Sequence, residues 1–532
     1  MEETNTAKVP WLALIAMMLG VFLSSLVSSS VNVALPKMMA VFGVNAASIQ
    51  WIVTAYTLVC GVVVPMSGYL CDRFGAKLTL LSSLVIFTLG CFLCAISWSD
   101  TSLIVFRVIQ AIGGGLIVPV VMTLQYLMIP REKMGLAMGL FGISVMVAPA
   151  IGPTLGGIII DAMNWQWIFL INIPLGIASI VLVWFLIKET PTRKDIKLDY
   201  IGVILCSLAC FTMLLALSQG QKEGWTSLYI VNLFIVAVFA FILFSIWETI
   251  TPEPLLDLKL LNNRTLVFSL MAVSVFTVGM FAGMFLMPLY AQNIMGYSPT
   301  QTGILLLPQA LVMAVMMPIA GILFDKFGAR PIGLVGLTIA AYYTYQLHTL
   351  TAGISFGALN WLLVKRAIGL GLVTGPLMTV GMNTIPQHKA SQGSALSNLL
   401  RQIAVSMGIP ILVSIMNTRI VYHTAWLADT VNYGNPMAVS VIKKLAGALY
   451  LSGVKVQAPF STAAALSILS GLNTKEAYIC GIQDTFFAAG LILALGIPFC
   501  LFLSKRAEVK ESWKQKERFP APAFSPVENK RD

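Results

Sequence analysis

The chain has 532 residues, of which 58% are hydrophobic and only 10% are charged, and its mean hydropathy is +0.87. Because a soluble domain carries about 25% charged residues, this composition excludes a soluble enzyme or a DNA-binding module and indicates an all-α polytopic membrane protein. The net charge of +11 agrees with that class, since basic residues collect in the cytoplasmic loops of membrane proteins. We therefore expect a lipid bilayer, and no nucleic acid, around the chain.

Apolar stretches long enough to cross a hydrocarbon core of about 30 Å recur along the whole sequence. The first of them is longer than the apolar core of a signal peptide, about 7–15 residues, and is interpreted as a retained span. The fourteen predicted spans are 11–34, 51–71, 78–98, 101–125, 135–160, 165–187, 198–217, 228–248, 266–290, 303–324, 331–350, 357–381, 394–416 and 483–504. An even number of spans places both termini on the same side.

The distribution of Lys and Arg predicts which side that is. Nearly all basic residues of the short connections lie on the side of the termini, whereas the short connections on the other side carry only Lys37 and Lys222. Long loops count for little in this rule, so residues 417–482 are set aside. The sequence predicts a multi-pass protein of the cell (inner or plasma) membrane with both termini cytoplasmic.

A ten-residue pattern occurs twice. Residues 68–77 (GYLCDRFGAK) end the second predicted span, and residues 321–330 (GILFDKFGAR) end the tenth. The shared glycines, acids and bases are Gly68, Asp72, Arg73, Gly75 and Lys77 in the first copy and Asp325, Gly328 and Arg330 in the second. Glycine gives the backbone the freedom that a tight turn needs. The duplication indicates two homologous halves, as in transporters built from repeats with the binding site between them.

These motifs resemble those of a known family. GYLCDRFGAK resembles motif A of the major facilitator superfamily, residues 107–115 (RVIQAIGGG) resemble its motif B, and residues 148–157 (APAIGPTLGG) resemble motif C, the signature of its antiporters. Residues 165–176 (WQWIFLINIPLG) and 398–402 (NLLRQ) are typical of its fourteen-helix drug:proton antiporter branch. The resemblance covers nearly the whole chain.

The resemblance implies a major facilitator fold of two six-helix bundles plus two inserted helices. The expected domains are an N-terminal bundle (1–190), the inserted helices (191–262), a C-terminal bundle (263–504) with a long outer loop (417–482), and a cytoplasmic tail (505–532). It also implies secondary active transport by alternating access and no cofactor.

Motif C has a physical interpretation of its own. Gly152 and Pro153 are expected to bend the fifth span, because proline removes a backbone hydrogen bond. Gly156 and Gly157 are expected to let a neighbouring helix approach closely. Plain helix packing explains these residues as well, whereas the resemblance implies that the bend governs access to a cavity.

The charges in the interior of the predicted spans are all basic, since every acid lies at a span end, in a loop or in a tail. Relatives in this branch often carry a carboxylate shortly before an NVALP sequence, but here residues 26–31 (LVSSSV) precede residues 32–36 (NVALP) and contain no acid. Arg107 and Arg366, in contrast, lie inside the fourth and twelfth spans, where ionisable residues are usually functional. Lys365 is expected to snorkel to the interface. A cavity with bases and no acids favours a neutral or anionic substrate over a cation.

Polar side chains in the spans complete the candidate site, although a single serine often bonds only to its own helix. The candidate cavity residues are Arg107, Gln110, Arg366, Ser28, Asn32, Tyr56, Gln125, Tyr290 and Gln292. The three histidines are scattered and no P-loop sequence is present, so neither a metal site nor ATP hydrolysis is expected.

We therefore predict a secondary exporter of hydrophobic or amphiphilic small molecules, of the drug efflux type and driven by proton antiport. Because no span carries an acid in its interior, Asp72, Asp161, Asp325 and Asp484 are the candidate proton carriers. One alternative is an exporter of an organic anion driven by the membrane potential, and another is a membrane-embedded enzyme.

The long outer loop contains an apolar stretch at residues 436–451. This stretch is predicted to be either an interfacial amphipathic helix or a docking surface for a periplasmic adaptor; without such a partner we expect a monomer.

Overall fold

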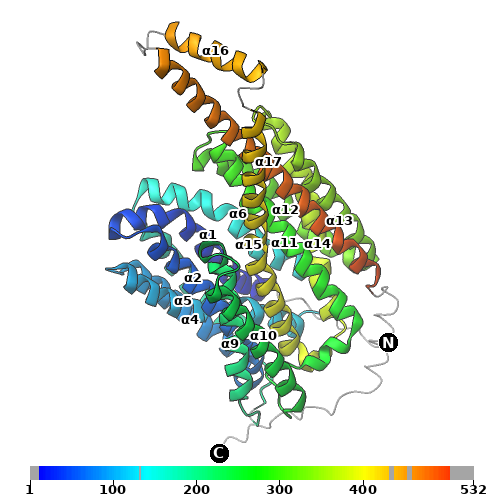
Figure 1. Cartoon of the computed structure of the whole chain (residues 1–532). Helices are drawn as coiled ribbons and strands as arrows, with labels where there is room; N and C mark the ends of the chain where they lie inside the picture. The colour runs from blue at the N-terminus through cyan, green and yellow to red at the C-terminus, as the bar shows by residue number, and fades with distance from the viewer. Residues whose placement is uncertain (1–10, 131–132, 194, 431–435, 452–457, 504–532) are drawn as a thin grey trace, which may run out of the picture.

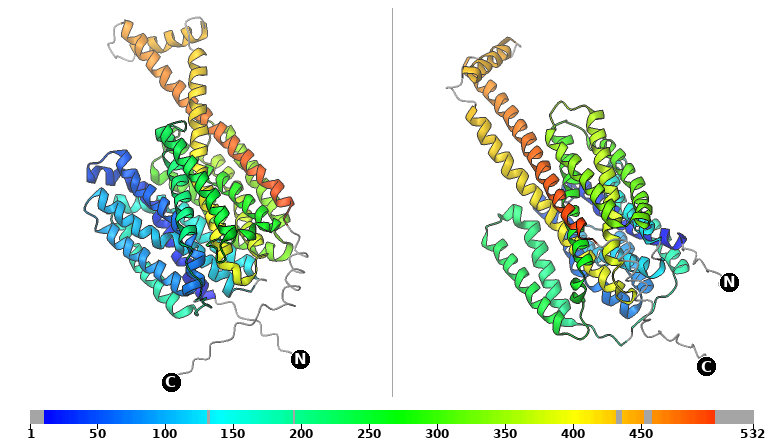
Figure 2. Two further views of the ribbon diagram at one scale, coloured as in Figure 1. Left: turned by 60° about the horizontal axis from the view of Figure 1, so that its bottom comes forward. Right: turned by 90° about the vertical axis from the view of Figure 1, so that its right-hand side faces the viewer.

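Helices make up nearly all of the computed structural model, which describes residues 11–130, 133–193, 195–430, 436–451 and 458–503. Within these ranges there are α-helices and short 3-10 helices and no strand, which confirms the predicted all-α architecture. Two helical halves lie against each other, and a helical extension projects beyond one end (Figures 1 and 2). The predicted tail, residues 505–532, lies outside the described residues.

The first half contains the helices α1 to α8. Its second span is broken, because α2 and α3 meet at an angle of 55° where Pro65 leaves a carbonyl without its helical donor. The central helix α1 packs against α5, α6 and α8. The helices are α1 (Trp11–Phe42), α2 (Ala46–Val63), α3 (Met66–Phe74), α4 (Ala76–Ala95), α5 (Asp100–Met128), α6 (Met134–Ala162), α7 (Trp167–Leu170) and α8 (Asn172–Leu186).

The second half repeats this arrangement around α11, which packs against α14, α15 and α17. Short 3-10 helices, η3 (Leu347–Thr349) and η4 (Gln387–Lys389), precede α14 and α15. The helices are α11 (Arg264–Asn293), α12 (Pro299–Phe327), α13 (Ala329–Gln346), α14 (Phe356–Met382), α15 (Ala390–Thr430), α16 (Pro436–Leu451) and α17 (Ala458–Leu501). We call the end of the bundle at Gly75 and Gly328 the turn end, and the opposite end the extension end.

Two further helices, α9 (Tyr200–Glu223) and α10 (Leu228–Ile250), form an antiparallel pair between the halves in sequence. Gly224 makes the turn between them with a positive φ of 87°, a conformation that favours glycine. The α9 helix packs against α2 and α15. A linker containing η2 (Leu258–Asn262) then leads to α11.

The most extensive contact between two helices joins the halves, between α6 and α12. Glycines make this approach possible: a Cβ at Gly139 would lie 2.5 Å from the Met317 carbonyl oxygen, and one at Gly321 would lie 2.2 Å from the Gly135 carbonyl oxygen. Lipid gives no hydrophobic drive for helices to associate, so close packing of small residues is the main source of stability here. One hydrophobic core continues from the first half into the second.

The predicted number of fourteen spans is not confirmed. Eleven helical stretches in the described residues are long and apolar enough to cross a membrane, and two bent pairs raise the number to thirteen. The predicted span at 331–350 corresponds to α13, which has only 18 residues and ends in a polar stretch that includes Tyr342, Tyr345 and Gln346. This helix is therefore short, and its polar end makes it less apolar than the helices counted as spans.

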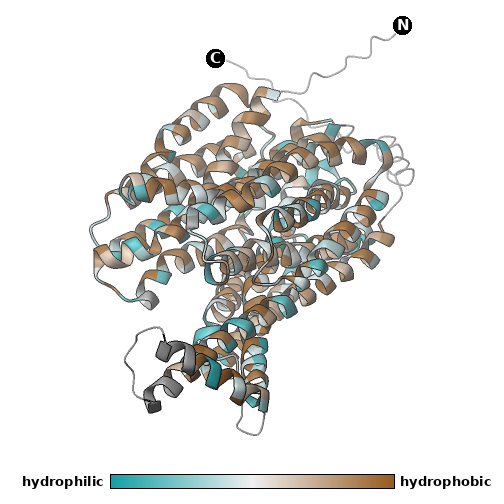
Figure 3. Ribbon diagram, turned by 90° about the horizontal axis from the view of Figure 1, so that it is seen from above, coloured by the Kyte–Doolittle hydropathy of each residue, from teal (hydrophilic) through white to brown (hydrophobic). Residues whose placement is uncertain are grey.

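The predicted outer loop, residues 417–482, is largely helical, and we call it the extension. The α15 helix continues to Thr430 and α17 begins at Ala458, so both run well past the predicted span ends, and α16 packs against α17 at the tip (Figure 1). In Figure 3, hydrophilic residues recur along the extension, whereas hydrophobic residues dominate the bundle helices.

Charged residues interrupt the apolar pattern in this region, and one acid on α17 pairs with two basic side chains on α15. The Asp484 carboxylate on α17 accepts a hydrogen bond from Arg419 Nε at 2.5 Å and lies 2.7 Å from His423 Nε2, both on α15. Apolar periodicity alone could not reveal this pairing. The stretch at 436–451 forms α16 as a helix at the tip, beyond the ends of the bundle helices (Figures 1 and 2).

The α6–α12 contact predicts different responses to the same substitution at two glycines of α6. Gly139→Ala should lower the thermal stability of the purified protein, because overpacking against the Met317 backbone destabilises by about 1–3 kcal/mol. Gly157→Ala is the matched control, since no atom of the part of the chain that the structure describes lies within 4 Å of the added methyl group. Thermal unfolding in detergent measures both, and equal melting temperatures for the two variants would contradict the packing argument.

Candidate functional site

The first glycine-acid-base turn connects to the opposite half. Gly75 adopts a positive φ of 89° between α3 and α4, and the Asp72 carboxylate accepts a hydrogen bond from the Ser391 hydroxyl at the start of α15. Gly68 lies against the same part of α15, where a Cβ would be 3.4 Å from the backbone of Gln392. The turn therefore fixes the first half to the second at the turn end.

The second turn makes the reciprocal connection. Gly328 has a φ of 84° between α12 and α13, and the Asp325 carboxylate accepts a hydrogen bond of 3.1 Å from the Gly135 N–H near the start of α6. A carboxylate on a helix N-terminus is favoured by the helix dipole and by the unsatisfied N–H groups there. Each acid is thus bound to the half that does not carry it.

The bases of the two turns lie at the edge of these contacts. Lys77 pairs with Glu189 at 3.6 Å and lies 5.6 Å from the centre of the Trp184 ring. Arg73 and Arg330 are half-buried. Lys77 and Glu189 both belong to the first half, so among the hydrogen bonds and ion pairs of these turns the acids, and not this base, connect the halves.

The bend in α6 lies against α1. The two parts of α6, on either side of Ala150, meet at 41°, next to Pro149 and Pro153. Ser30 on α1 donates a hydrogen bond of 3.0 Å to the Gly152 carbonyl oxygen, and a Cβ at Gly156 would lie 3.2 Å from the Ser30 backbone.

The expectation that Gly157 also allows close approach is wrong. No atom of the described residues lies within 4 Å of a Cβ at that position. Of these two glycines only Gly156 faces α1, because adjacent residues on a helix point about 100° apart.

Arg107 is completely buried inside the first half, where three neighbours surround its guanidinium. Its Nη1 donates to Gln110 Oε1 at 2.6 Å and its Nε to the Ile52 carbonyl oxygen at 3.3 Å. The guanidinium carbon lies 4.0 Å from the centre of the Tyr56 ring, a cation–π contact. Gln110 in turn donates to Cys91 Sγ at 2.9 Å. The structure therefore brings three predicted site residues together, and Arg107 Nη2 is buried without a partner.

Arg366 occupies a comparable position in the second half. It is 2% exposed, and its Nε donates to Thr344 Oγ1 at 2.8 Å while Nη2 donates to the Gly279 and Met280 carbonyl oxygens. A Cβ at Gly283 would lie 2.2 Å from Nη1, so this glycine makes room for the guanidinium. No ion pair of the described residues involves Arg107 or Arg366.

The other predicted residues are not gathered around these arginines. Asn32 is exposed and donates to the Ser28 carbonyl oxygen of its own helix at 3.4 Å. Gln125 is fully buried, and neither atom of its amide has a partner. Tyr290 is buried near the extension end, where it donates to the Thr351 carbonyl oxygen at 2.6 Å, and Gln292 is exposed.

The structure adds one base that the list of candidates omitted. Arg401 on α15 lines a cavity of about 10 Å³ between the halves, together with Met122 from α5 of the first half and Ser269 from α11. Its Nη2 donates to Asn398 Oδ1 at 3.1 Å, whereas its Nε is buried without a partner. The signal was present in the sequence, because Arg401 is an arginine inside the predicted span 394–416.

A metal centre finds no support in this arrangement. Among the described residues, no group of three or more His, Cys, Asp or Glu side chains could hold a metal ion. The polar groups that line the cavity between the halves are instead the Arg401 guanidinium and the hydroxyl groups of Ser269 and Ser397, which can form hydrogen bonds with a small molecule.

Two helical halves joined by reciprocal turns, with polar groups buried at their boundary, define a secondary transporter. Residues 17–409 match the family model described as Major Facilitator Superfamily, and the chain belongs to this family. It is a multi-pass membrane transporter and not an enzyme.

Three known proteins show the range of similarity. The uncharacterized MFS-type transporter YhcA of Bacillus subtilis (strain 168) is 36% identical over 528 residues, 98% of each chain. The multidrug export protein EmrB of Escherichia coli (strain K12) is 29% identical over 436 residues, which cover 81% of this chain and 85% of EmrB. The crystal structure of the human organic anion transporter MFSD10 (TETRAN) has a TM-score of 0.57 at 13% identity and covers 92% of this chain and 99% of its own; this likeness shows the fold.

The contact between Asp72 and Ser391 predicts that the turn acts as a latch between the halves. Asp72→Asn should reduce transport several-fold while the protein still folds and inserts, because a hydrogen bond to a charged group contributes about 1.5–3 kcal/mol. Uptake or efflux of a fluorescent substrate in cells measures the rate, and surface expression measures insertion. Asp195→Asn, at an exposed position, is the control. Transport by Asp72→Asn at the wild-type rate would show that the latch does not limit the cycle.

Proposed function

We propose that this transporter exports hydrophobic or amphiphilic small molecules from the cell by alternating access, with the turn end and both termini in the cytoplasm of a cell (inner or plasma) membrane. The direction of transport is supported by similarity to a relative named as a multidrug export protein. The orientation is supported by the basic residues of the turn-end connections.

The observation that carries the proposal is the position of Arg401. The cavity beside it is bounded by residues of both halves, so its shape changes when the halves move relative to each other. Its walls are otherwise apolar or weakly polar, with Met122, Met378 and Met382 among them. Methionines give an adaptable surface that fits varied apolar molecules.

The charges favour a neutral or anionic substrate. Arg107, Arg366 and Arg401 are buried or half-buried in the interior of their helices, and none of them belongs to an ion pair of the described residues. The planar guanidinium of arginine binds a carboxylate or sulfonate through two parallel hydrogen bonds. A cation would instead be repelled from this boundary.

The driving force is proposed to be proton antiport, on the basis of the motif C resemblance. Asp72 and Asp325 stand at the contacts between the halves, whereas Asp484 is bound to Arg419 and Asp161 is exposed. Asp72 and Asp325 are therefore the proton carriers that movement of the halves affects most directly. An anionic substrate offers a second route, because moving one negative charge out of the cell gains about 2.3 kcal/mol per 100 mV of membrane potential.

The extension would face the exterior in this orientation. Its surface includes the exposed side chains of Val421, Tyr422 and Trp426. In a cell with an outer membrane, this surface is proposed to contact a periplasmic adaptor; otherwise the transporter acts as a monomer.

If Arg401 binds anionic substrates, its replacement should lower the affinity for anions specifically. Arg401→Gln should raise the KM for an anionic amphiphile about tenfold or more and change that of a neutral analogue much less, since a charge-assisted hydrogen bond contributes about 1.5–3 kcal/mol. Arg401→Lys, which keeps the charge, should have a KM for the anionic amphiphile between those of the wild type and of Arg401→Gln. Concentration-dependent efflux from cells measures these values, and equal changes for anionic and neutral substrates would contradict the assignment.

The driving force can be tested separately in proteoliposomes. A pH gradient and a membrane potential are imposed one at a time, and the flux of an anionic substrate is measured. Proton antiport predicts flux that follows the pH gradient. Flux that follows the potential and ignores the pH gradient would overturn antiport and support the electrogenic alternative.

A further inference from the structure

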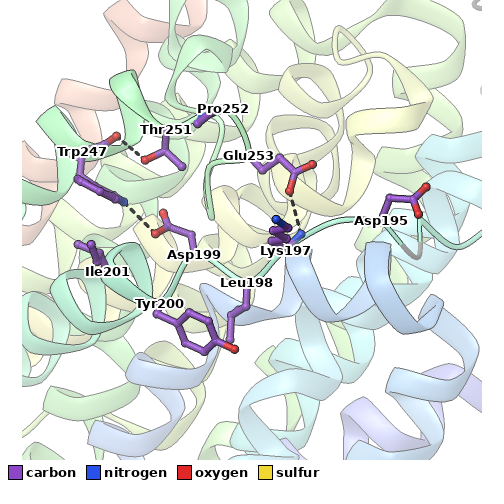
Figure 4. Close-up of a pocket in the computed structure, with 10 residues that line it drawn as sticks. All are labelled: Asp195, Lys197, Leu198, Asp199, Tyr200, Ile201, Trp247, Thr251, Pro252 and Glu253. Carbon is purple, nitrogen blue, oxygen red and sulfur yellow. Dashed lines mark hydrogen bonds between the residues drawn. The ribbon is translucent and has the colours of Figure 1, made fainter.

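Two acidic side chains meet at the turn end of the inserted helices. Asp199 caps the N-terminus of α9: its Oδ1 accepts hydrogen bonds from the Gly202 N–H at 2.9 Å and from Trp247 Nε1 on α10 at 2.8 Å (Figure 4). Glu248 follows Trp247, is 3% exposed, and accepts a hydrogen bond from the Leu256 N–H at 3.3 Å through its Oε2. Each carboxyl group thus uses one oxygen to hold the structure together.

The second oxygen of each acid is buried and has no hydrogen-bond partner. These atoms are Asp199 Oδ2 and Glu248 Oε1. Both face Gly202, because a Cβ at that residue would lie 2.3 Å from the first oxygen and 2.9 Å from the second. The absence of a side chain at Gly202 lets the two oxygens approach each other.

Two ionised carboxylates are strongly disfavoured in this arrangement. Like charges that share a buried site cannot both ionise without a large penalty, and a shared proton relieves it. An unpaired buried carboxylate oxygen also loses its hydration without replacement. A proton between the two oxygens removes both problems at once, since one oxygen then donates a hydrogen bond to the other.

The surrounding groups do not replace that proton with another positive charge. Cys206 on α9 and Asp257 in the linker are the other titratable groups around Glu248. Lys389, which reaches this region from η4, is bound to Asp257 at 2.5 Å. Figure 4 shows a pocket that is lined by Lys197 and Glu253 as well as Asp199, and the Lys197 backbone N–H donates there to the Glu253 carboxylate at 2.8 Å. The side chains of Lys197 and Glu253 are exposed.

We propose that Glu248 and Asp199 form a carboxylic acid–carboxylate pair that binds one proton at the turn end of the inserted helices. The ligand is a proton from the solution on that side, which forms an O–H bond on one carboxyl group and a hydrogen bond to the other. This site lies outside the two six-helix bundles, and it does not rest on the proposed substrate, direction or driving force of transport.

The pair is connected to the contact between the halves by a short path. Glu248 holds the linker through Leu256, the next residue Asp257 binds Lys389, and two residues later Ser391 donates to Asp72. Removal of the proton places two negative charges opposite each other and weakens the hold of α10 on this linker. The protonation of the pair therefore affects the position of the start of α15.

Infrared spectroscopy of the purified full chain tests the proposal without a transport assay. At neutral pH almost all carboxyl groups are ionised, so the C=O stretch of a protonated carboxyl group reports an unusual site. We expect wild-type protein to show such a band at neutral pH and to lose it in alkaline buffer. Glu248→Gln and Asp199→Asn should each lack the band, whereas the control Glu253→Gln should keep it.

Thermal unfolding gives an independent measurement. The wild type should lose stability as the buffer is made alkaline, because the proton leaves and the two carboxylates repel each other. Glu248→Gln should be insensitive over the same range, since its amide donates permanently to Asp199. If that variant does not fold, Asp199→Asn, which retains the capping oxygen, decides the question by the infrared band alone.

Three results would overturn the proposal. The first is a neutral-pH band that persists in both Glu248→Gln and Asp199→Asn. The second is an equal loss of the band in Glu253→Gln. The third is a wild-type protein that lacks the band at neutral pH and whose thermal stability is raised by Na⁺. This result would assign a metal cation and not a proton to the pair.

Discussion

The contact between α6 and α12 is the constraint on which the rest of the structure depends. The backbones approach so closely at Gly135, Gly139 and Gly321 that no side chain fits between them. In a bilayer such a contact gains its stability from van der Waals packing and not from exclusion of water. It fixes the distance between the halves, and both acidic turns, as well as the cavity beside Arg401, are positioned by that distance.

Each half stabilises its buried arginine with groups that belong to the same half. Arg107 is held by an amide, a backbone carbonyl and the Tyr56 ring, and Arg366 is held by Thr344 and two backbone carbonyls. A charge stabilised by dipoles within one half moves with that half as a rigid unit. Arg401 differs in its position, because it lies at the boundary between the halves. This contrast separates arginines that maintain the halves from one that is available between them.

Much of this architecture could be predicted from the sequence, because hydropathy, the duplicated turn and the family motifs are local signals. These local signals did not predict the features that depend on contacts between residues distant in the chain. Residues 417–430 continue α15 as a helix, and on it Arg419 and His423 contact Asp484, some 60 residues away. The contact of Arg107 with Tyr56 forms only when α2 packs against α5. The surroundings of Gly157 and the cavity beside Arg401 likewise form only when α1, α5, α6 and α15 are assembled. The pairing of Glu248 with Asp199 depends in the same way on the packing of α10 against α9.

The length of α15 has a mechanical consequence. This single helix of 41 residues carries Ser391 at one end and Arg419 towards the other, with Arg401 between them. At a rise of 1.5 Å per residue it is a rod about 60 Å long, and a tilt of about 5° around its middle would move each end by about 3 Å. That displacement is as long as a hydrogen bond. A small rotation of α15 at the central cavity would therefore displace the contacts at both of its ends together.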